Sequence, residues 1–268
     1  MRRLALVVLL LLLPSSAFAT WSVVAVDRNT GRVVIASATC LALEEPISLK
    51  TWQAVIVPGV GVAACQAAID TPGTNKTIVF EELKKGTDPK EIIRRLHEDP
   101  AIEQRQYGIV DLKGRSAGFS GANNQKSSLD RQGEVPGTGI FYSIQGNILR
   151  GDSVITEAVK AFVETKGALT DRVMAAMEAG DRLGGDSRCN CATAPRASAP
   201  CEGKTSHVAY ILMAEKSDTN GTSFNNGHYS LYITVTQGTI KPGENANPVK
   251  TLRLRYDAWR KAQPASFR

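Results

Sequence analysis

The first hydrophobic feature of the chain is a continuous apolar run over residues 4–13. Arg2 and Arg3 precede the run, Pro14 ends it, and the small residues Ala17 and Ala19 follow. This order is typical of a secretory signal peptide. A membrane anchor is the weaker alternative, because ten helical residues span only about 15 Å, roughly half of the hydrocarbon core. We predict that a bacterium exports the chain, to the periplasm or outside the cell, and that the mature protein begins at Thr20.

Beyond the leader, the apolar positions predict strands that pair as hairpins. Residues 20–27 and 32–37 flank one turn, and residues 52–57 and 60–65 flank another. Both pairs are nearly continuously apolar, as expected of strands that are covered on both faces. Further strands are predicted over residues 106–111, 116–120, 141–145, 208–214 and 229–236.

Apolar periodicity and capping residues predict helices between these strands. Thr87-Asp88-Pro89 is typical of a helix start, and Asn247-Pro248 opens a final helix. Residues 152–166 carry one apolar face, and Thr170 is expected to cap a helix over 170–179. Strand pairs that alternate with helices favour a layered architecture with antiparallel pairing over a doubly wound parallel sheet.

Composition excludes only a few classes of protein. Removal of residues 1–19 leaves a length that suits one domain, residues 20–268. The leader holds two of the 32 basic residues, so 30 basic residues face 26 acidic ones and the mature net charge is +4. This balance predicts no nucleic-acid partner, and no later stretch is apolar enough to predict a membrane span. No phosphate-binding or dinucleotide motif occurs, and no cofactor is expected.

Five cysteines lie in the mature chain, at positions 40, 65, 189, 191 and 201. In an oxidising compartment they are expected to form disulfides, and an odd number leaves at least one free or paired with another chain. Cys201 is expected to pair with Cys189 or Cys191, and Cys40 with Cys65; the alternative leaves Cys65 as a buried free thiol. A zinc site that adds His207 is less favoured, because the C-x-C spacing is shorter than usual, and no metal is expected.

Thr20 is the residue in the chain that most suggests chemistry. Cleavage after Ala19 would give it a free α-amine beside its hydroxyl. A threonine hydroxyl needs a base to become a nucleophile, and an α-amine titrates at about 7.7–8.0, so it can serve as that base. The alternative is that Thr20 is simply the residue that follows a signal peptide.

Several segments resemble a known family. The opening TWSVVAVD and its hairpin are similar to the start of the family called domain of unknown function 1028, which is largely uncharacterised and related to N-terminal-nucleophile (Ntn) hydrolases. Further segments match in order over roughly residues 20–236: 59–67 (GVGVAACQA), 105–111 (RQYGIVD), 117–121 (AGFSG), 145–149 (QGNIL) and 179–188, which ends in GGDSR. The resemblance implies an α+β fold, a four-layer αββα sandwich with two mainly antiparallel sheets.

The matched segments also suggest site residues. With Thr20 as nucleophile, Asn147 and Gln66 are candidate oxyanion donors, and Asp186 is a candidate holder of the Thr20 ammonium. Arg188 is expected to pair with Asp186 or to bind a substrate carboxylate, and Ser120 is a candidate substrate contact.

Each suggested role has a structural alternative. Asn147 suits a turn with positive φ, Gln66 can satisfy strand-edge backbone, and Asp186 with Arg188 can form a structural ion pair. Cys40 stands where family members carry a basic residue, and residues 187–204 look like an insertion.

Two functions from different classes follow. The first is an exported Ntn amidohydrolase that cleaves a small amide or peptide-like bond. The alternative is a catalytically inactive protein of the same fold that binds a small ligand or cell-wall fragment; a structural protein with a vestigial cleft is a weaker third. A homo-oligomer is compatible with either.

Overall fold

The structure is a computed structural model that describes residues 20–43, 48–193 and 198–264. The predicted signal peptide, residues 1–19, lies outside the described residues. Within the described ranges, no helix is long and apolar enough to cross a membrane.

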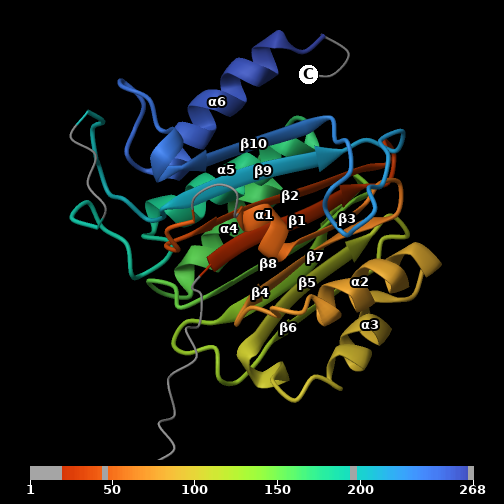
Figure 1. The fold of residues 1–268 in the computed structure, drawn as a ribbon. Helices are drawn as coiled ribbons and strands as arrows, with labels where there is room; N and C mark the ends of the chain where they lie inside the picture. The colour runs from red at the N-terminus through yellow and green to blue at the C-terminus, as the bar shows by residue number, and fades with distance from the viewer. Residues whose placement is uncertain (1–19, 44–47, 194–197, 265–268) are drawn as a thin grey trace, which may run out of the picture.

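A six-stranded antiparallel sheet forms the centre of the molecule (Figure 1). Its strands run in the order β10-β9-β2-β1-β8-β7, with bounds Leu231–Thr236, Val208–Ala214, Arg32–Thr39, Thr20–Asp27, Ile140–Asn147 and Leu129–Val135. Strand β1 therefore lies between β2 and β8, and seven of its eight residues are buried. The predicted hairpin of the first two strands is confirmed.

A second, four-stranded antiparallel sheet packs against one face of the first. Its strands are β3 (Ala54–Val57), β4 (Gly61–Ala67), β5 (Arg105–Asp111) and β6 (Ser116–Ser120), in that order. An apolar cluster of β1, β2, β3, β4 and β9 side chains fills part of the space between the sheets.

Helices cover the two outer faces. Helices α4 (Ser153–Glu164), α5 (Leu169–Arg182) and α6 (Pro248–Ala262) share an apolar cluster with the six-stranded sheet. Helices α2 (Thr74–Lys85) and α3 (Pro89–Leu96) share another with the four-stranded sheet, and the short α1 (Leu49–Gln53) precedes β3. The layers run helix, sheet, sheet, helix, so the expected αββα sandwich with antiparallel sheets is confirmed.

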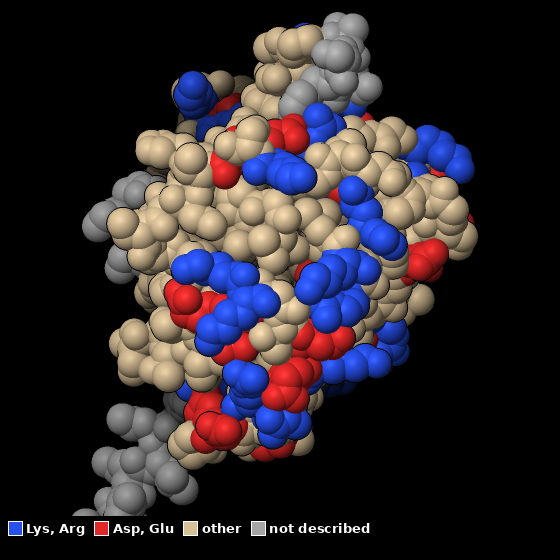
Figure 2. All heavy atoms as spheres, turned by 90° about the vertical axis from the view of Figure 1, so that its right-hand side faces the viewer, with Lys and Arg blue, Asp and Glu red and all other residues tan. Residues whose placement is uncertain are grey.

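The surface over α2 and α3 carries charges of both signs side by side (Figure 2). Four basic residues of these helices pair with acids three or four positions away or on the neighbouring helix: Lys84 with Glu81, Lys85 and Arg95 with Glu82, and Arg94 and Arg95 with Glu91. These basic groups form solvated helix faces.

Four elements differ from the sequence-based expectation. Trp52 and Gln53 belong to α1 rather than to the following strand, because Ser48 caps a short helix there. Thr170 does not cap α5: the helix begins at Leu169, and the Asp171 carboxylate accepts from the Ala168 N–H instead. Helix α2 and strand β7 were not predicted; α2 has no side-chain cap, and β7 is a largely polar sheet edge without alternation.

The disulfides are Cys40–Cys189 and Cys191–Cys201, and Cys65 is a buried free thiol. The Cys191–Cys201 bridge is one of the two expected for Cys201. The expected Cys40–Cys65 bridge is wrong, because Cys65 packs in the apolar cluster beneath α2 and α3. Cys40 follows β2 and meets the loop around Asp186 instead. No group of three or more metal-ligating side chains is found in the part of the chain that the structure describes.

Candidate functional site

Thr20 is the first residue of a central strand, and both neighbouring strands contact it. Its cross-strand partners are Thr39 on β2 and Asn147 on β8. The Thr20 nitrogen donates to Asn147 Oδ1 at 3.1 Å, and its hydroxyl donates to Thr39 Oγ1 at 3.3 Å. Thr39 Oγ1 also accepts from the Leu41 N–H at 3.3 Å. The nitrogen and the hydroxyl of Thr20 are therefore both held by fixed partners on adjacent strands.

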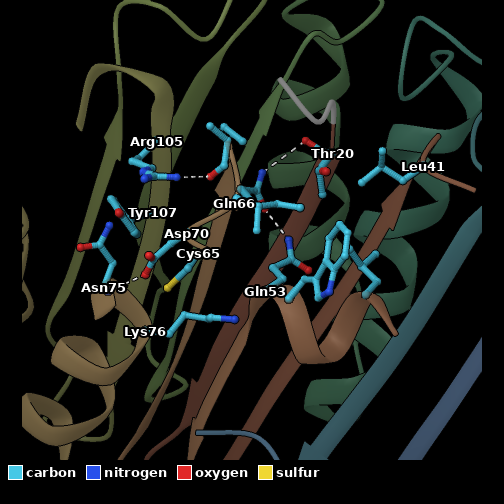
Figure 3. Close-up of a pocket in the computed structure, with 15 residues that line it drawn as sticks. Thr20, Leu41, Gln53, Cys65, Gln66, Asp70, Asn75, Lys76, Arg105 and Tyr107 are labelled. Atoms are coloured by element: carbon cyan, nitrogen blue, oxygen red, sulfur yellow. Dashed lines mark hydrogen bonds between the residues drawn. The ribbon is translucent and has the colours of Figure 1, made fainter. Parts of the chain in front are cut away.

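A pocket opens beside Thr20, and its lining borders about 460 Å³ of space that includes open solvent (Figure 3). It lies where β3 begins. Ala54, the first residue of β3, pairs with Ala64 of β4, so residues 65–67 of β4 extend past β3 and lie beside α1. Apolar side chains of Leu41, Leu49 and Trp52 line part of the wall. The pocket therefore joins the threonine to the edge of the smaller sheet.

Gln66 lines this pocket, and its side chain donates a hydrogen bond to the backbone carbonyl of Thr20. Its Nε2 donates to Thr20 O at 3.3 Å and to Gln106 Oε1 at 2.7 Å. Its Oε1 accepts from Ser22 Oγ and from Gln53 Nε2, both at 2.6 Å. Since an amide carries two donor protons and two acceptor lone pairs, protein groups use all of them. This arrangement favours a positioning role for Gln66 over an oxyanion donor.

Asn147 ends β8 and is fully buried. The alternative of an Asn147 turn with positive φ is wrong, because the left-handed residue is the next one, Ile148, at φ 53°. The Oδ1 of Asn147 accepts from Thr20, so this side chain contacts the nitrogen that processing would turn into the α-amine. An orienting contact to that nitrogen is the role its geometry favours.

Asp186 is fully buried, and its hydrogen bonds hold the loop that follows α5 against the end of β2. Its carboxylate accepts from the Cys40 N–H at 2.8 Å, from the Arg188 N–H at 3.0 Å, and from the Arg188 guanidinium at 2.8 and 3.1 Å. The Asp186–Arg188 ion pair is thus one of the two expected arrangements for Arg188. The Cys40–Cys189 disulfide reinforces the same junction.

The remaining predicted site residue, Ser120, lies on β6 in the polar layer between the sheets. It donates to Asp130 Oδ2 at 2.7 Å and accepts from Gln106 Nε2 at 2.7 Å. Of the six predicted site residues, the structure brings Thr20, Gln66 and Asn147 into contact. Ser120, Asp186 and Arg188 are outside the pocket lining that the described residues form.

The pocket wall away from Thr20 carries titratable side chains (Figure 3). Burial raises the pKa of the Cys65 thiol to about 12, and burial raises the pKa of Tyr107 well above its ordinary value. Burial also lowers the pKa of Lys76, which the charges of Cys65 and Asp70 partly oppose. At neutral pH Cys65 is therefore a protonated thiol and Tyr107 a protonated phenol, and both line the pocket together with Lys76.

Sequence reasoning did not single out Thr39, Lys76 or Tyr107. Thr39 had a usable signal, because the register of the predicted hairpin places it opposite Thr20. Lys76 lies on the unpredicted helix α2, and Tyr107 lies within a predicted strand whose family motif assigns it no role. These two residues meet in one pocket through tertiary packing, for which a single sequence carries no signal.

Two antiparallel sheets between helical layers, with a strand-terminal threonine beside a pocket, define a layered α+β sandwich protein. The chain belongs to the family of unknown function DUF1028, which matches residues 20–200. This confirms the resemblance seen in the sequence.

A solved structure supports the same fold. The crystal structure of protein SPO2555 from Silicibacter pomeroyi, of the DUF1028 family, is similar with a TM-score of 0.63 and 22% sequence identity. The match covers 93% of this chain and 91% of that chain. Likeness at this identity establishes the fold alone. Among curated proteins, none matches this chain.

Proposed function

We propose that the mature protein is an exported Ntn amidohydrolase that cleaves a small amide or peptide-like bond with Thr20. The observation that carries the proposal is the position of Thr20. It begins a central strand, lines the pocket, and has its nitrogen and hydroxyl held by Asn147 and Thr39. A nucleophile and a base on one residue need no histidine, and the pocket lining has none among the described residues.

The chemistry proceeds in two halves. The Thr20 hydroxyl oxygen attacks the amide carbonyl carbon while the neutral α-amine takes the hydroxyl proton. The amine then gives this proton to the leaving nitrogen, the C–N bond breaks, and an ester to Thr20 remains. Water attacks the ester, the amine takes a proton from the water and returns it to the Thr20 oxygen, and the acid leaves. Asn147 orients the amine by accepting one N–H, which leaves the nitrogen lone pair for the proton.

Export follows from the predicted signal peptide, and two disulfides support it. Cys40–Cys189 and Cys191–Cys201 would persist in the periplasm or outside the cell, whereas the bacterial cytosol keeps thiols reduced. Signal removal would then perform two tasks, because it releases the protein and creates the catalytic amine.

One observation favours the inactive alternative. Cys40, at the position where the resemblance implies a basic residue in many family members, is committed to a disulfide, so it cannot lower the proton affinity of the Thr20 amine as a cation would. A protein of this kind would bind a small ligand or cell-wall fragment in the pocket without cleaving it.

Two measurements test the proposal. Intact mass and N-terminal sequencing of the exported protein should give Thr20 as the first residue; any other start rejects the mechanism. A carbonyl electrophile such as a β-lactone, a strained cyclic ester, should then acylate the exported protein and not Thr20→Ala. Absence of acylation together with ligand binding in the pocket would favour the inactive alternative.

A further inference from the structure

The pocket contains a buried lysine without an acidic partner. Lys76, on α2, is 6% exposed, and among the described residues no carboxylate lies within ion-pair distance of it. Its ammonium donates to Thr51 O at 3.0 Å and lies over the Phe224 ring, 4.7 Å from the ring centre. An ammonium carries three donor protons, so two of them have no protein acceptor in the described structure.

An acceptor on a ligand would satisfy the remaining Lys76 donors. A buried polar group without a partner typically costs about 1–3 kcal/mol, so such a group in a pocket wall favours a ligand that satisfies it. The Tyr107 hydroxyl also has no hydrogen-bond partner among the residues described, but it is enclosed by protein and offers a ligand no donor.

The other charged groups of the lining are already engaged. Asp70 accepts from the Asn75 N–H at 2.6 Å at the start of α2, and its charge acts on Lys76 without an ion pair between them. The Arg105 guanidinium donates to Asp99 Oδ2 at 2.9 Å and to Ala68 O at 2.8 Å. Among the described lining residues, Lys76 is thus the cation that has no acid at ion-pair distance, and in Figure 3 its ammonium points toward Gln53 and away from Asp70.

We propose that this wall is a carboxylate subsite, and that the substrate is a small amide that also carries a carboxylate, held by Lys76. A carboxylate supplies one negative charge and several acceptor sites, which fits one ammonium that has no ion-paired acid. A phosphate monoester would bring about two charges and suits the wall less well. The inference rests on the proposed function for its hydrolytic part, because Thr20 lines the same pocket.

The binding test removes catalysis. Mature Thr20→Ala protein is titrated by calorimetry with malonate, glutarate and adipate, and with glutaramide as the neutral match. At least one dicarboxylate should bind at least tenfold more tightly than glutaramide. Lys76→Gln should remove that preference. Equal binding of acid and amide, binding by none of the acids, or an unchanged preference in Lys76→Gln would overturn the subsite.

Lys84→Gln is the matched control. Lys84 lies on the same helix and over the Phe80 ring at 4.9 Å, but it pairs with Glu81 on the surface. Its replacement should leave dicarboxylate binding unchanged. If it weakened binding as much as Lys76→Gln, the effect would be general charge attraction and the subsite would be rejected. Circular dichroism and thermal unfolding verify that each variant is folded.

A hydrolysis test separates the two proposals. Protein that begins at Thr20 is given glutaryl-p-nitroanilide and its neutral match valeryl-p-nitroanilide. We expect kcat/KM at least tenfold higher for the acid, with the preference lost as pH rises through the lowered pKa of Lys76 and absent in Lys76→Gln. Equal cleavage of both amides would reject the subsite and retain the hydrolase. Dicarboxylate binding through Lys76 with no cleavage of either amide would retain the subsite and count against the hydrolase.

Discussion

The two ends of the layer between the sheets have opposite chemistry, although the same strands build both. On β1, the inward side chains change from Ser22 near Thr20 to Val24 and Val26 farther along. The inward positions of β4, β5 and β8 show the same change: Gln66 to Val62, Gln106 to Val110, and Gln145 to Phe141. One end is a polar network around Thr20, and the other is an ordinary apolar core.

The polar end is closely connected. Gln145 donates to Ser22 at 2.6 Å, Ser22 donates to Gln66 at 2.6 Å, and Gln66 donates to Gln106 at 2.7 Å. Gly108 makes room for it, since a Cβ there would lie 2.0 Å from Gln145 Oε1. A satisfied buried network fixes side chains in one arrangement. The comparison teaches that stability is concentrated at the apolar end and positioning of Thr20 at the polar end.

Ile56→Ala at the apolar end should give the largest loss of stability. Ile56 is fully buried between the sheets, and removal of such a side chain typically costs about 2–5 kcal/mol. Urea unfolding measures the loss, and kcat/KM per folded molecule should stay within about twofold. A tenfold loss of activity in the folded variant would contradict the claim that the apolar end serves stability and the polar end positions Thr20.

Gln106→Leu at the polar end should cost less stability and more activity. It removes the acceptor of Gln66 and the donor to Gly146 O, and buried groups left unpaired typically cost about 1–3 kcal/mol. Loosening of Gln66 should also lower kcat/KM about tenfold, because Gln66 binds Thr20 O. Gln263→Leu, at the C-terminal end of α6 and outside the network, is the matched control and should affect neither quantity strongly. An active Gln106→Leu would show that the network does not position Thr20.

Cys65 lies on the face of β4 opposite to Gln66, and its ionisation should change the stability of the protein least. Burial raises the pKa of this thiol to about 12, so the folded protein keeps it protonated while the unfolded chain ionises near 9.0. Native protein at pH 8 should therefore react with iodoacetamide about a thousandfold more slowly than protein in urea. The folded state should also lose stability as pH rises from 9.0 towards 12, because only the unfolded thiol ionises in that interval. Rapid alkylation of the native protein would contradict the burial.

The sequence predicted many of the strands and helices because strand periodicity and helix caps are local signals, whereas the four-layer order was implied by the family resemblance. The first hairpin, α3 with its Asp88 cap and α6 with its Asn247 cap are confirmed. Elements without local signals were missed, as in α2, whose start carries no side-chain cap. The Cys40–Cys189 bridge joins residues 149 positions apart, and spacing alone does not determine such a pairing.

The site was predicted only in part, for the same physical reason. Thr20, Gln66 and Asn147 were found because family motifs mark them, and they do meet. Their detailed contacts depend on register: a glutamine on β4 meets Thr20 only because the two sheets pack at that level. Lys76 and Tyr107 reach the pocket from α2 and β5, so their proximity is a product of the tertiary fold.

The free amine of Thr20 is the central claim, and two proteins that differ by one residue test it most directly. One begins at Thr20, and the other begins at Ala19, so that the Thr20 nitrogen is an amide and cannot act as a base. Both are treated with a β-lactone at pH 8, and acylation of the Thr20 hydroxyl is measured by peptide mass spectrometry. We predict rapid acylation of the first protein and at least a hundredfold slower acylation of the second. Equal acylation of both, or acylation of neither at Thr20, would contradict the account.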